Sequence, residues 1–365
     1  MGSPYGARES LQWLVHLARP SWAEETELEK KPLSARLVAV TSDTPIVRIV
    51  LFGDLMPFWD RQKLAVTPAV RSFVRQADLV IGNCETPVAA KTTILPIMFA
   101  MGVDRVRSAL ETLGVQDHPG SCVLSVANNH AGDQRMAGFE ETLARLRALG
   151  ITIAGVHRNG NPAVPMIQAG PLQVAVLAWT DWINRDFRSK DLGVCRREHL
   201  DLQITAAREA NADCLLGFPH WDYEFRLFPS VKTVQCARRI LSRGITALVG
   251  HHPHVLQPIV LHPEGLCMYS LGNTTPLPTN LVRWPTLIGG VVCLEIVGAG
   301  EHLGAIAGYR VLPIRIRREP RRILVSAISV DDPISPNEQT LLGRLFPTRP
   351  GADSPQSELA GDVVS

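Results

Sequence analysis

Short, almost continuously apolar stretches alternate with amphipathic stretches through the first two thirds of the chain. The apolar stretches are typical of strands that are buried on both faces. We expect such strands at 46–52, 78–82, 123–126, 151–156, 174–179, 213–218 and 245–249. Apolar residues at three- and four-residue spacing predict helices at 67–76, 104–113, 200–210 and 231–242, and another that ends at Gly150. Strands that alternate with helices indicate the α/β class.

The pattern changes after residue 257. The stretches 258–262, 266–270, 289–297, 303–314 and 323–330 look like strands joined by short turns. They predict a second, mainly antiparallel sheet. We therefore divide the chain into an N-terminal arm at 1–45, a single domain at 46–330 and a C-terminal tail at 331–365. The tail is expected to be partly disordered, because 349–365 is rich in Pro, Gly, Ser and Asp.

Composition and charge narrow the class of protein. A formal net charge of +2 gives no reason to expect a nucleic-acid partner. The basic run at 315–322 is most simply a solvated hairpin or loop.

None of the seven cysteines forms a C-x-x-C pair, which favours a reducing compartment. The apolar stretch at 11–18 is too short and too polar for a signal peptide or a membrane span, so we expect a cytoplasmic protein.

Polar side chains follow five of the predicted strands, at the point where each strand ends. They are Asp54; Asn83 and Glu85; Asn129 and His130; His220; and His251, His252 and His254. Because open α/β sheets place their chemistry beyond the carboxyl ends of strands, we expect one rim of these residues along one edge of a sheet. Carboxylates, amides and imidazoles suit divalent Zn, Mn or Fe. The same groups could also transfer protons without a metal.

The three clustered histidines follow the strand at 245–249. Pro253 disfavours a helical conformation at His252, and side chains two positions apart share a face of an extended segment. His252 and His254 are therefore expected to converge on a metal ion or an anionic group, with His251 pointing elsewhere. A solvated turn rich in imidazole is the alternative.

These strand ends resemble the motifs of the CapA family, which is associated with poly-γ-glutamate capsule synthesis. The matching segments are Gly53-Asp54-Leu55-Met56, Asn83-Cys84-Glu85, Ala127-Asn128-Asn129-His130, His220-Trp221-Asp222-Tyr223-Glu224, Gly250-His251-His252-Pro253-His254 and Tyr269-Ser270-Leu271-Gly272-Asn273. They occur in order within about residues 46–300. The family belongs to the calcineurin-like metallophosphatase superfamily. The resemblance therefore implies a four-layer α/β/β/α sandwich, which agrees with a helix-rich first half and a strand-rich second half.

The resemblance also implies a role for each matching residue. The implied metal ligands are Asp54, Glu85, Asn129, His220, His252 and His254. His130 would act as an acid or electrostatic stabiliser, with Asp54 and His252 as the other catalytic residues. We assign Glu224, Trp221 and His251 to substrate binding; Glu224 matches the family's acidic residue after the His-Trp pair.

The sequence departs from these patterns at several positions. Met56 stands where metallophosphatases usually have a histidine ligand, and Glu85 stands where they usually have aspartate. Asp222 replaces the glycine that usually follows His-Trp in the CapA family, and Thr274 replaces an aromatic residue. Without the first-motif histidine, one metal of a two-metal centre would lose a ligand.

Three functions remain open. A metal-dependent hydrolase would cleave a γ-glutamyl, amide or phosphate bond in a poly-γ-glutamate or peptide-type polymer. A metal-free enzyme, of epimerase type, would use Asp54 or Glu85 with a histidine of 251–254 to move a proton at a peptide α-carbon. A non-catalytic assembly factor would bind a polyanionic chain or a synthase partner. We favour the hydrolase, with a peptide or polyglutamate-like substrate and one or two divalent ions.

Overall fold

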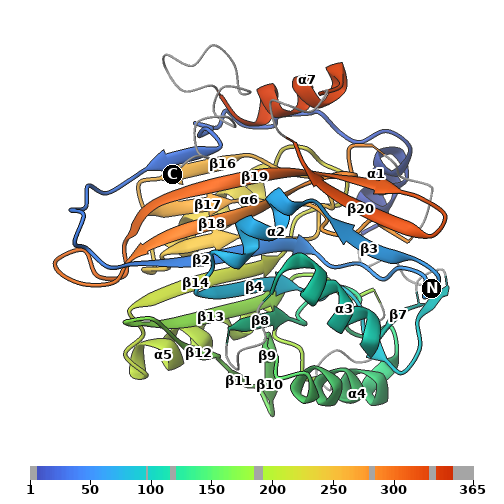
Figure 1. Ribbon diagram of the computed structural model, residues 1–365, viewed down its shortest axis with the longest axis horizontal. Helices are drawn as coiled ribbons and strands as arrows, with labels where there is room; N and C mark the ends of the chain where they lie inside the picture. The colour runs from blue at the N-terminus through green and yellow to red at the C-terminus, as the bar shows by residue number, and fades with distance from the viewer. Residues whose placement is uncertain are drawn as a thin grey trace.

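Two stacked β-sheets form the centre of the protein in the computed structural model, which describes residues 6–95, 98–115, 121–184, 192–278, 284–328 and 334–347 (Figure 1). The larger sheet runs in the order β3 (Lys63–Val66), β20 (Arg322–Ala327), β19 (Ile306–Arg318), β18 (Ile288–Val297), β2 (Ile46–Asp54), β4 (Leu79–Asn83), β8 (Cys122–Ser125) and β9 (Thr152–Ala154). The smaller sheet runs in the order β12 (Met166–Ala169), β13 (Leu172–Thr180), β14 (Cys214–His220), β15 (Ala247–Val249), β17 (Gly265–Met268) and β16 (Ile259–His262).

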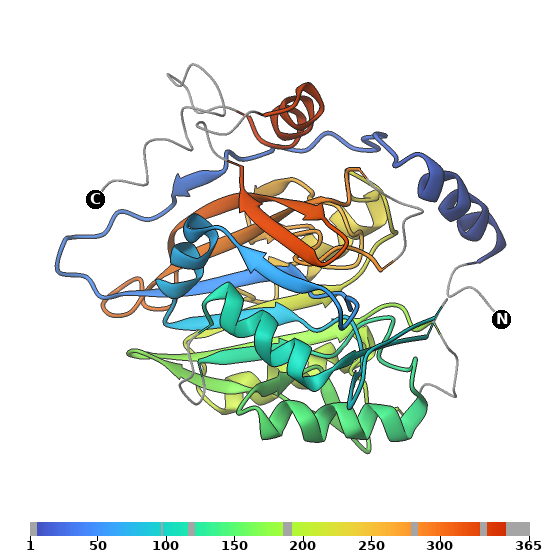
Figure 2. The same cartoon turned by 45° about the vertical axis from the view of Figure 1, so that its right-hand side comes forward.

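Helices cover the outer face of each sheet. The larger sheet carries α2 (Pro68–Arg75), α3 (Val103–Leu113) and α4 (Arg135–Ala148), and the smaller carries α5 (Leu200–Glu209) and α6 (Val231–Leu241). Figure 2 shows α2, α3 and α4 on the near side of the larger sheet. The four-layer α/β/β/α sandwich implied by the resemblance is confirmed. The shorter elements are η2 (Arg197–His199), the hairpin β10 (Val156–Arg158) and β11 (Asn161–Ala163), and the small sheet of β5 (Val88–Ala89), β6 (Thr93–Leu95) and β7 (Met98–Gly102).

Strand β13 shows why the buried strands read as continuous apolar runs. Val174 and Val176 belong to the main core, to which both sheets contribute. Leu177 and Trp179, on the opposite face, belong to a second core that also includes residues of α5 and α6. Because a helix layer covers one face and a sheet covers the other, neither set of side chains reaches water.

The strands after residue 257 do not form a sheet of their own, which corrects the expectation from the sequence. β16 and β17 extend the smaller sheet, whereas β18, β19 and β20 extend the larger one. β18 pairs antiparallel with β2, with Val292 opposite Leu51. All ten residues of β18 are buried. A strand without an exposed face fits a central position, and an apolar run alone does not identify its partner.

Segments from both ends of the chain pack onto the sandwich. Within the predicted arm, α1 (Ala7–Ala18) is a helix and β1 (Ser34–Arg36) pairs with β19. In the predicted tail, α7 (Pro336–Leu345) is held to β19 by a hydrogen bond of 2.9 Å from Arg315 to Glu338. The predicted disorder at 349–365 lies outside the described residues. Within the described ranges, no helix is both long and apolar enough to cross a membrane.

Gly53 lies near the end of β2, beside the segment that links β17 of the smaller sheet to β18 of the larger sheet. A Cβ at this position would lie 2.0 Å from the carbonyl oxygen of Gly272, so the backbone would have to move. The next residue, Asp54, donates its backbone N–H to that same oxygen at 2.9 Å. The contact therefore fixes how closely β2 approaches this linking segment.

We predict that Gly53→Ala destabilises the fold by about 2 kcal/mol or more, because overpacking in a closed contact forces backbone shifts. The measurement is urea denaturation with the midpoint and slope fitted together. Gly343→Ala is the matched control: nothing lies within 4 Å of its added Cβ, and alanine favours a helix by about 0.5–1 kcal/mol. Equal stability of the two variants would contradict the prediction.

Candidate metal centre

The polar residues at the strand ends meet between the two sheets. Asp54, Asn83 and Asn129 follow or end strands of the larger sheet, whereas His220 and the cluster 251–254 follow or end strands of the smaller sheet. Isolated bridges join Asp54 to Asn273 and His220 to His251. The expectation of one rim on one sheet is therefore corrected: two sheet ends face each other, and each contributes half of the cluster.

Asp54 is the best-connected carboxylate of the cluster. It is fully buried, and its Oδ1 accepts a hydrogen bond of 2.8 Å from Asn83 Nδ2 and lies 3.2 Å from His251 Nδ1. Its Oδ2 lies 3.4 Å from His254 Nδ1. Burial alone would raise the pKa of Asp54, but the hydrogen bonds and charges of these two histidines outweigh it and lower the pKa well below its ordinary value. Asp54 is therefore an ionised carboxylate.

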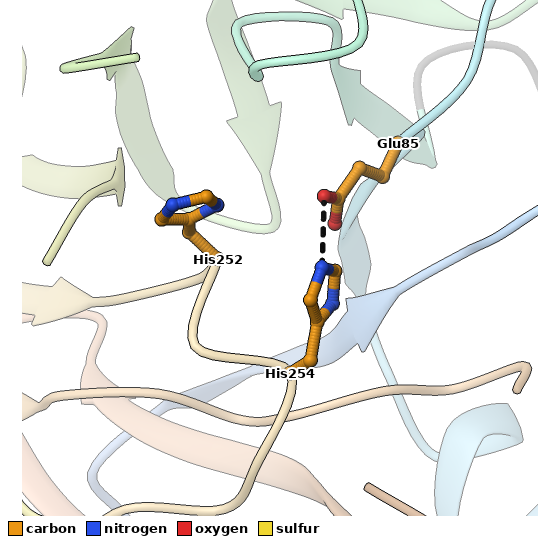
Figure 3. Close-up of side chains that lie close together, drawn as sticks. All are labelled: Glu85, His252 and His254. Carbon is orange, nitrogen blue, oxygen red and sulfur yellow. Dashed lines mark ion pairs between the residues drawn. The ribbon is translucent and has the colours of Figure 1, made fainter. Parts of the chain in front are cut away.

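Glu85 is also fully buried, but it has fewer contacts than Asp54 to offset the cost of burying its carboxyl group. Its Oε1 lies 3.5 Å from His220 Nε2 and 3.5 Å from His254 Nε2, the second of which is the pair marked in Figure 3. This oxygen has no hydrogen-bond partner. Burial, followed by the charge of Asp54, raises the pKa of Glu85 well above its ordinary value. A buried carboxyl oxygen without a hydrogen bond is costly, and a bound cation would give it a partner.

The clustered histidines converge, although not in the predicted way. His252 and His254 have φ angles of 96° and 57°, so the segment is kinked through the left-handed region and is not extended. Their ring centroids lie 6.1 Å apart, and Figure 3 shows both rings beside Glu85. His251 does not point elsewhere, because it contacts Asp54. Left-handed backbone at two non-glycine residues is strained, and such strain gathers at functional sites.

Two of the histidines are held in the neutral form. Burial and the neighbouring His252 lower the pKa of His220 well below its ordinary value. Burial and the neighbouring His254 do the same to the pKa of His252. Metal ions bind neutral imidazole, so these lowered pKa values favour the form of each ring that binds a metal.

Asn129 and His130 lie beside this cluster. Asn129 Oδ1 is 3.0 Å from His220 Nε2. His130 Nδ1 is 2.8 Å from Asp133 Oδ2, and that oxygen also accepts the Phe99 backbone N–H at 2.9 Å. Asp133 was missed from the sequence, although its position three residues after His130 on a turn could have identified it.

Two groups of side chains could each hold a metal ion. They are Glu85 with His252 and His254, and Asp54 with Glu85 and His220. Within each group the ligand atoms lie within 4.8 Å of one another, and every residue is buried. The carboxylate and imidazole donors and the unsatisfied Glu85 oxygen fit Zn, Mn or Fe. Because both groups use Glu85, two ions would have to share that carboxylate.

Met56 and Asp222 explain how the chain accommodates its departures from the motifs. Met56 is fully buried in an apolar cluster with Phe225 and Leu277, so an apolar side chain fills the place of the usual histidine. Asp222 has a φ of 63°, a conformation that glycine adopts freely and aspartate tolerates. Its carboxylate accepts the Ser230 backbone N–H at 2.9 Å, which holds this turn.

The residues assigned to substrate binding separate in the structure. Trp221 is fully buried in the second core and donates its indole N–H to the Tyr269 carbonyl at 3.0 Å. This corrects its assignment: consecutive residues of an extended segment face opposite sides, so Trp221 faces the second core while His220 faces the site. Glu224 accepts a hydrogen bond of 2.5 Å from Trp13 of α1.

The chain matches a family model described as bacterial capsule synthesis protein PGA_cap over residues 48–275. It is 29% identical over 210 residues to the PGA biosynthesis protein CapA of Bacillus subtilis (strain 168), covering 56% of this chain and 54% of that protein. It is 26% identical over 244 residues to the capsule biosynthesis protein CapA of Bacillus anthracis, covering 62% and 59%. The chain thus spans between half and two thirds of the length of these relatives.

Two solved structures are similar to the chain. A hypothetical protein from Thermus thermophilus gives a TM-score of 0.45 at 19% identity, over 73% of this chain and 99% of that one. A novel phosphatase from Mycoplasma pneumoniae gives a TM-score of 0.44 at 11% identity, over 74% of this chain and 94% of that one.

All six motif segments lie inside the range matched by the family model, which covers more than half of the sequence. The chain belongs to the bacterial capsule synthesis protein family, PGA_cap.

Proposed function

We propose that the protein is a metal-dependent hydrolase that cleaves a γ-glutamyl or similar amide bond. The observation that carries this proposal is the buried convergence of Glu85, His252 and His254, with Asp54 and His220 beside them. Two buried carboxylates, one of which has an unsatisfied oxygen, have no structural use that an apolar core would not serve better. A cation would give the unsatisfied Glu85 oxygen a partner.

Family membership supports the substrate class. Two relatives are named for PGA or capsule biosynthesis, and poly-γ-glutamate is a polymer of γ-glutamyl amide bonds. We infer a capsule-related role for this chain on that basis. Glu224 belongs to neither ligand group, but its charge contributes to raising the pKa of Glu85 and of His254.

The side chains divide the work in this proposal. Asp54, Glu85, His220, His252 and His254 would hold the ion, with the Asn129 oxygen beside them. When bound, a divalent ion polarises the scissile bond and lowers the pKa of water towards neutrality.

His130 would move the proton. Its Nδ1 is engaged with Asp133, so its Nε2 remains to carry a proton to the leaving amine. The buried Asp133 carboxylate fixes the orientation of the ring. His130 itself is 7% exposed, which gives the ring limited access to solvent.

We predict that wild-type protein purified without chelator carries Zn, Mn or Fe in near-stoichiometric amount by elemental analysis. Asp54→Ala and His252→Ala are expected to lose it, because each removes a ligand from a buried group. His302→Ala is the matched control, since His302 is an exposed histidine. Metal-free wild type that takes up no added ion would refute the proposal and leave acid/base catalysis or polymer binding as the functions to test.

We predict that metal binding releases protons and strengthens as pH rises. Burial and Asp54 raise the pKa of Glu85; burial lowers the pKa of His254, but hydrogen bonding to Asp54 outweighs it and the net shift is upward. A raised pKa means that these groups retain protons that an incoming cation must displace. Calorimetric titration with Zn²⁺ in two buffers of different ionisation enthalpy measures the number released. Glu85→Gln should bind more weakly and release fewer protons, and heats that are independent of the buffer would contradict the prediction.

We predict that His130→Ala lowers kcat by about 100- to 10,000-fold, the usual range for a lost proton-transfer group. Metal content should stay at the wild-type level, because His130 belongs to neither ligand group. The assay is hydrolysis of γ-glutamyl peptides with a chromogenic leaving amine. Asp133→Asn should give a smaller loss, since it weakens the support of the ring and leaves the ring in place. Unchanged turnover of His130→Ala would exclude this residue as the acid.

A further inference from the structure

Asn184 joins the two halves of the site through contacts that no motif anticipates. It follows β13 of the smaller sheet, yet its backbone N–H donates to the Asn129 carbonyl of the larger-sheet side at 2.9 Å. Its side-chain Oδ1 accepts a hydrogen bond of 3.2 Å from Asn129 Nδ2. Its Nδ2 lies 3.4 Å from Nδ1 and 3.5 Å from Nε2 of His130. One residue thus contacts both members of the Asn-His pair.

A chain of hydrogen bonds runs from Asn83 through His220 and Asn129 to Asn184, and each residue donates to the next. Asn83 Nδ2 is 3.3 Å from His220 Nδ1, so that ring nitrogen accepts and Nε2 carries the proton. His220 Nε2 then donates to Asn129 Oδ1 at 3.0 Å. Asn129 Nδ2 is left to donate, and Asn184 Oδ1 receives it.

The consequence concerns which end of the Asn129 carboxamide faces the site. An amide can turn its oxygen or its nitrogen towards a neighbour with almost the same shape. If Asn129 Nδ2 faced the cluster, its N–H groups would meet the His220 Nε2–H donor, and the nitrogen could not bind a cation. Because Asn184 offers an oxygen to Asn129 Nδ2, it favours the orientation in which Asn129 Oδ1 faces His220.

The segment that carries Asn184 is itself fixed. Trp182 donates its backbone N–H to Thr180 Oγ1 at 3.2 Å, and that hydroxyl donates to the Trp182 carbonyl at 2.8 Å. The Trp182 indole donates to the Asp222 carbonyl at 2.6 Å. Asp181 donates its backbone N–H to the His220 carbonyl at 3.0 Å. Asn184 is therefore presented to Asn129 by an anchored turn.

We propose that Asn184 is a positioning residue of the metal centre, which holds the Asn129 carboxamide with its oxygen towards the cation. The proposal rests on the proposed function, because it assigns Asn184 a role in binding the same ion. It adds a residue outside both ligand groups and outside the six motif segments. Asn184 acts through Asn129 and His130 and is not itself a ligand.

The test is a double-mutant cycle read by Zn²⁺ affinity, measured by competition with a chromophoric chelator. Asn184→Ala should weaken Zn²⁺ binding about tenfold in the wild-type background, the lower end of the range for residues that orient metal ligands. In the Asn129→Ala background the same change should alter affinity by no more than about twofold, as for independent sites. A merely structural contribution would weaken binding equally in both backgrounds, and that result would overturn the proposal.

Three further variants complete the design. Asn184→Asp keeps an oxygen for Asn129 Nδ2 and should bind Zn²⁺ at least as well as wild type. Asn184→Leu keeps the volume without polar atoms, should behave like Asn184→Ala, and takes its place if that variant does not fold. Asn161→Ala, a change at an exposed asparagine, should leave affinity unchanged.

The outcomes separate the two proposals. Wild type that binds no Zn²⁺ would overturn the metal centre and the role of Asn184 together. Wild type that binds Zn²⁺, with Asn184→Ala unchanged or Asn184→Asp as weak as Asn184→Ala, would overturn the role of Asn184 alone. Loss confined to the wild-type background, with recovery in Asn184→Asp, is the expected result.

Discussion

The burial of Asp54 and Glu85 in one cluster is the constraint on which the site depends. Two carboxyl groups removed from water disfavour each other's ionisation. The cluster resolves this by asymmetry: His251 and His254 contact Asp54 and lower its pKa against the effect of burial, while the pKa of Glu85 rises. In the absence of a cation, one carboxyl group is thus ionised and the other favours its proton. Of the two carboxyl groups, Glu85 is therefore the one that a bound cation would stabilise more.

The stacking of the two sheets makes this burial possible. Gly53 allows β2 to approach Gly272, in the segment that links the two sheets. Gly250 allows a similar approach on the smaller sheet, where an added Cβ would lie 2.0 Å from the Tyr269 carbonyl oxygen. Asn273 lies 3.0 Å from His254 Nδ1 through its own Oδ1, and its Nδ2 donates to the His254 carbonyl at 3.3 Å. The histidine cluster is thus held by backbone contacts that only glycine permits. It is also held by Asn273, whose side chain contacts both the ring and the carbonyl of His254.

The sequence, through its resemblance to the CapA family, predicted the sandwich better than it predicted how the polar residues are arranged. Strands buried on both faces leave a clear apolar signal, so a polar residue at a strand end, such as Asp54, stands out. The left-handed turn through His252 was missed, because Pro253 does not encode it. Asn184 was missed for another reason: it lies 55 positions from Asn129, and the two residues meet only because β8 and β13 lie in sheets that stack. No periodicity records such a contact, and asparagine in a loop is ordinary turn chemistry.

The composition of the two ligand groups argues for an order of occupancy. Glu85 with His252 and His254 offers one carboxylate and two imidazoles, a set that matches common Zn and Fe sites. Asp54 with Glu85 and His220 offers two carboxylates and one imidazole. The buried Met56 side chain contributes no imidazole to this second group. We therefore expect the group with two imidazoles to bind the first ion. A second ion would have to share the Glu85 carboxylate with the first.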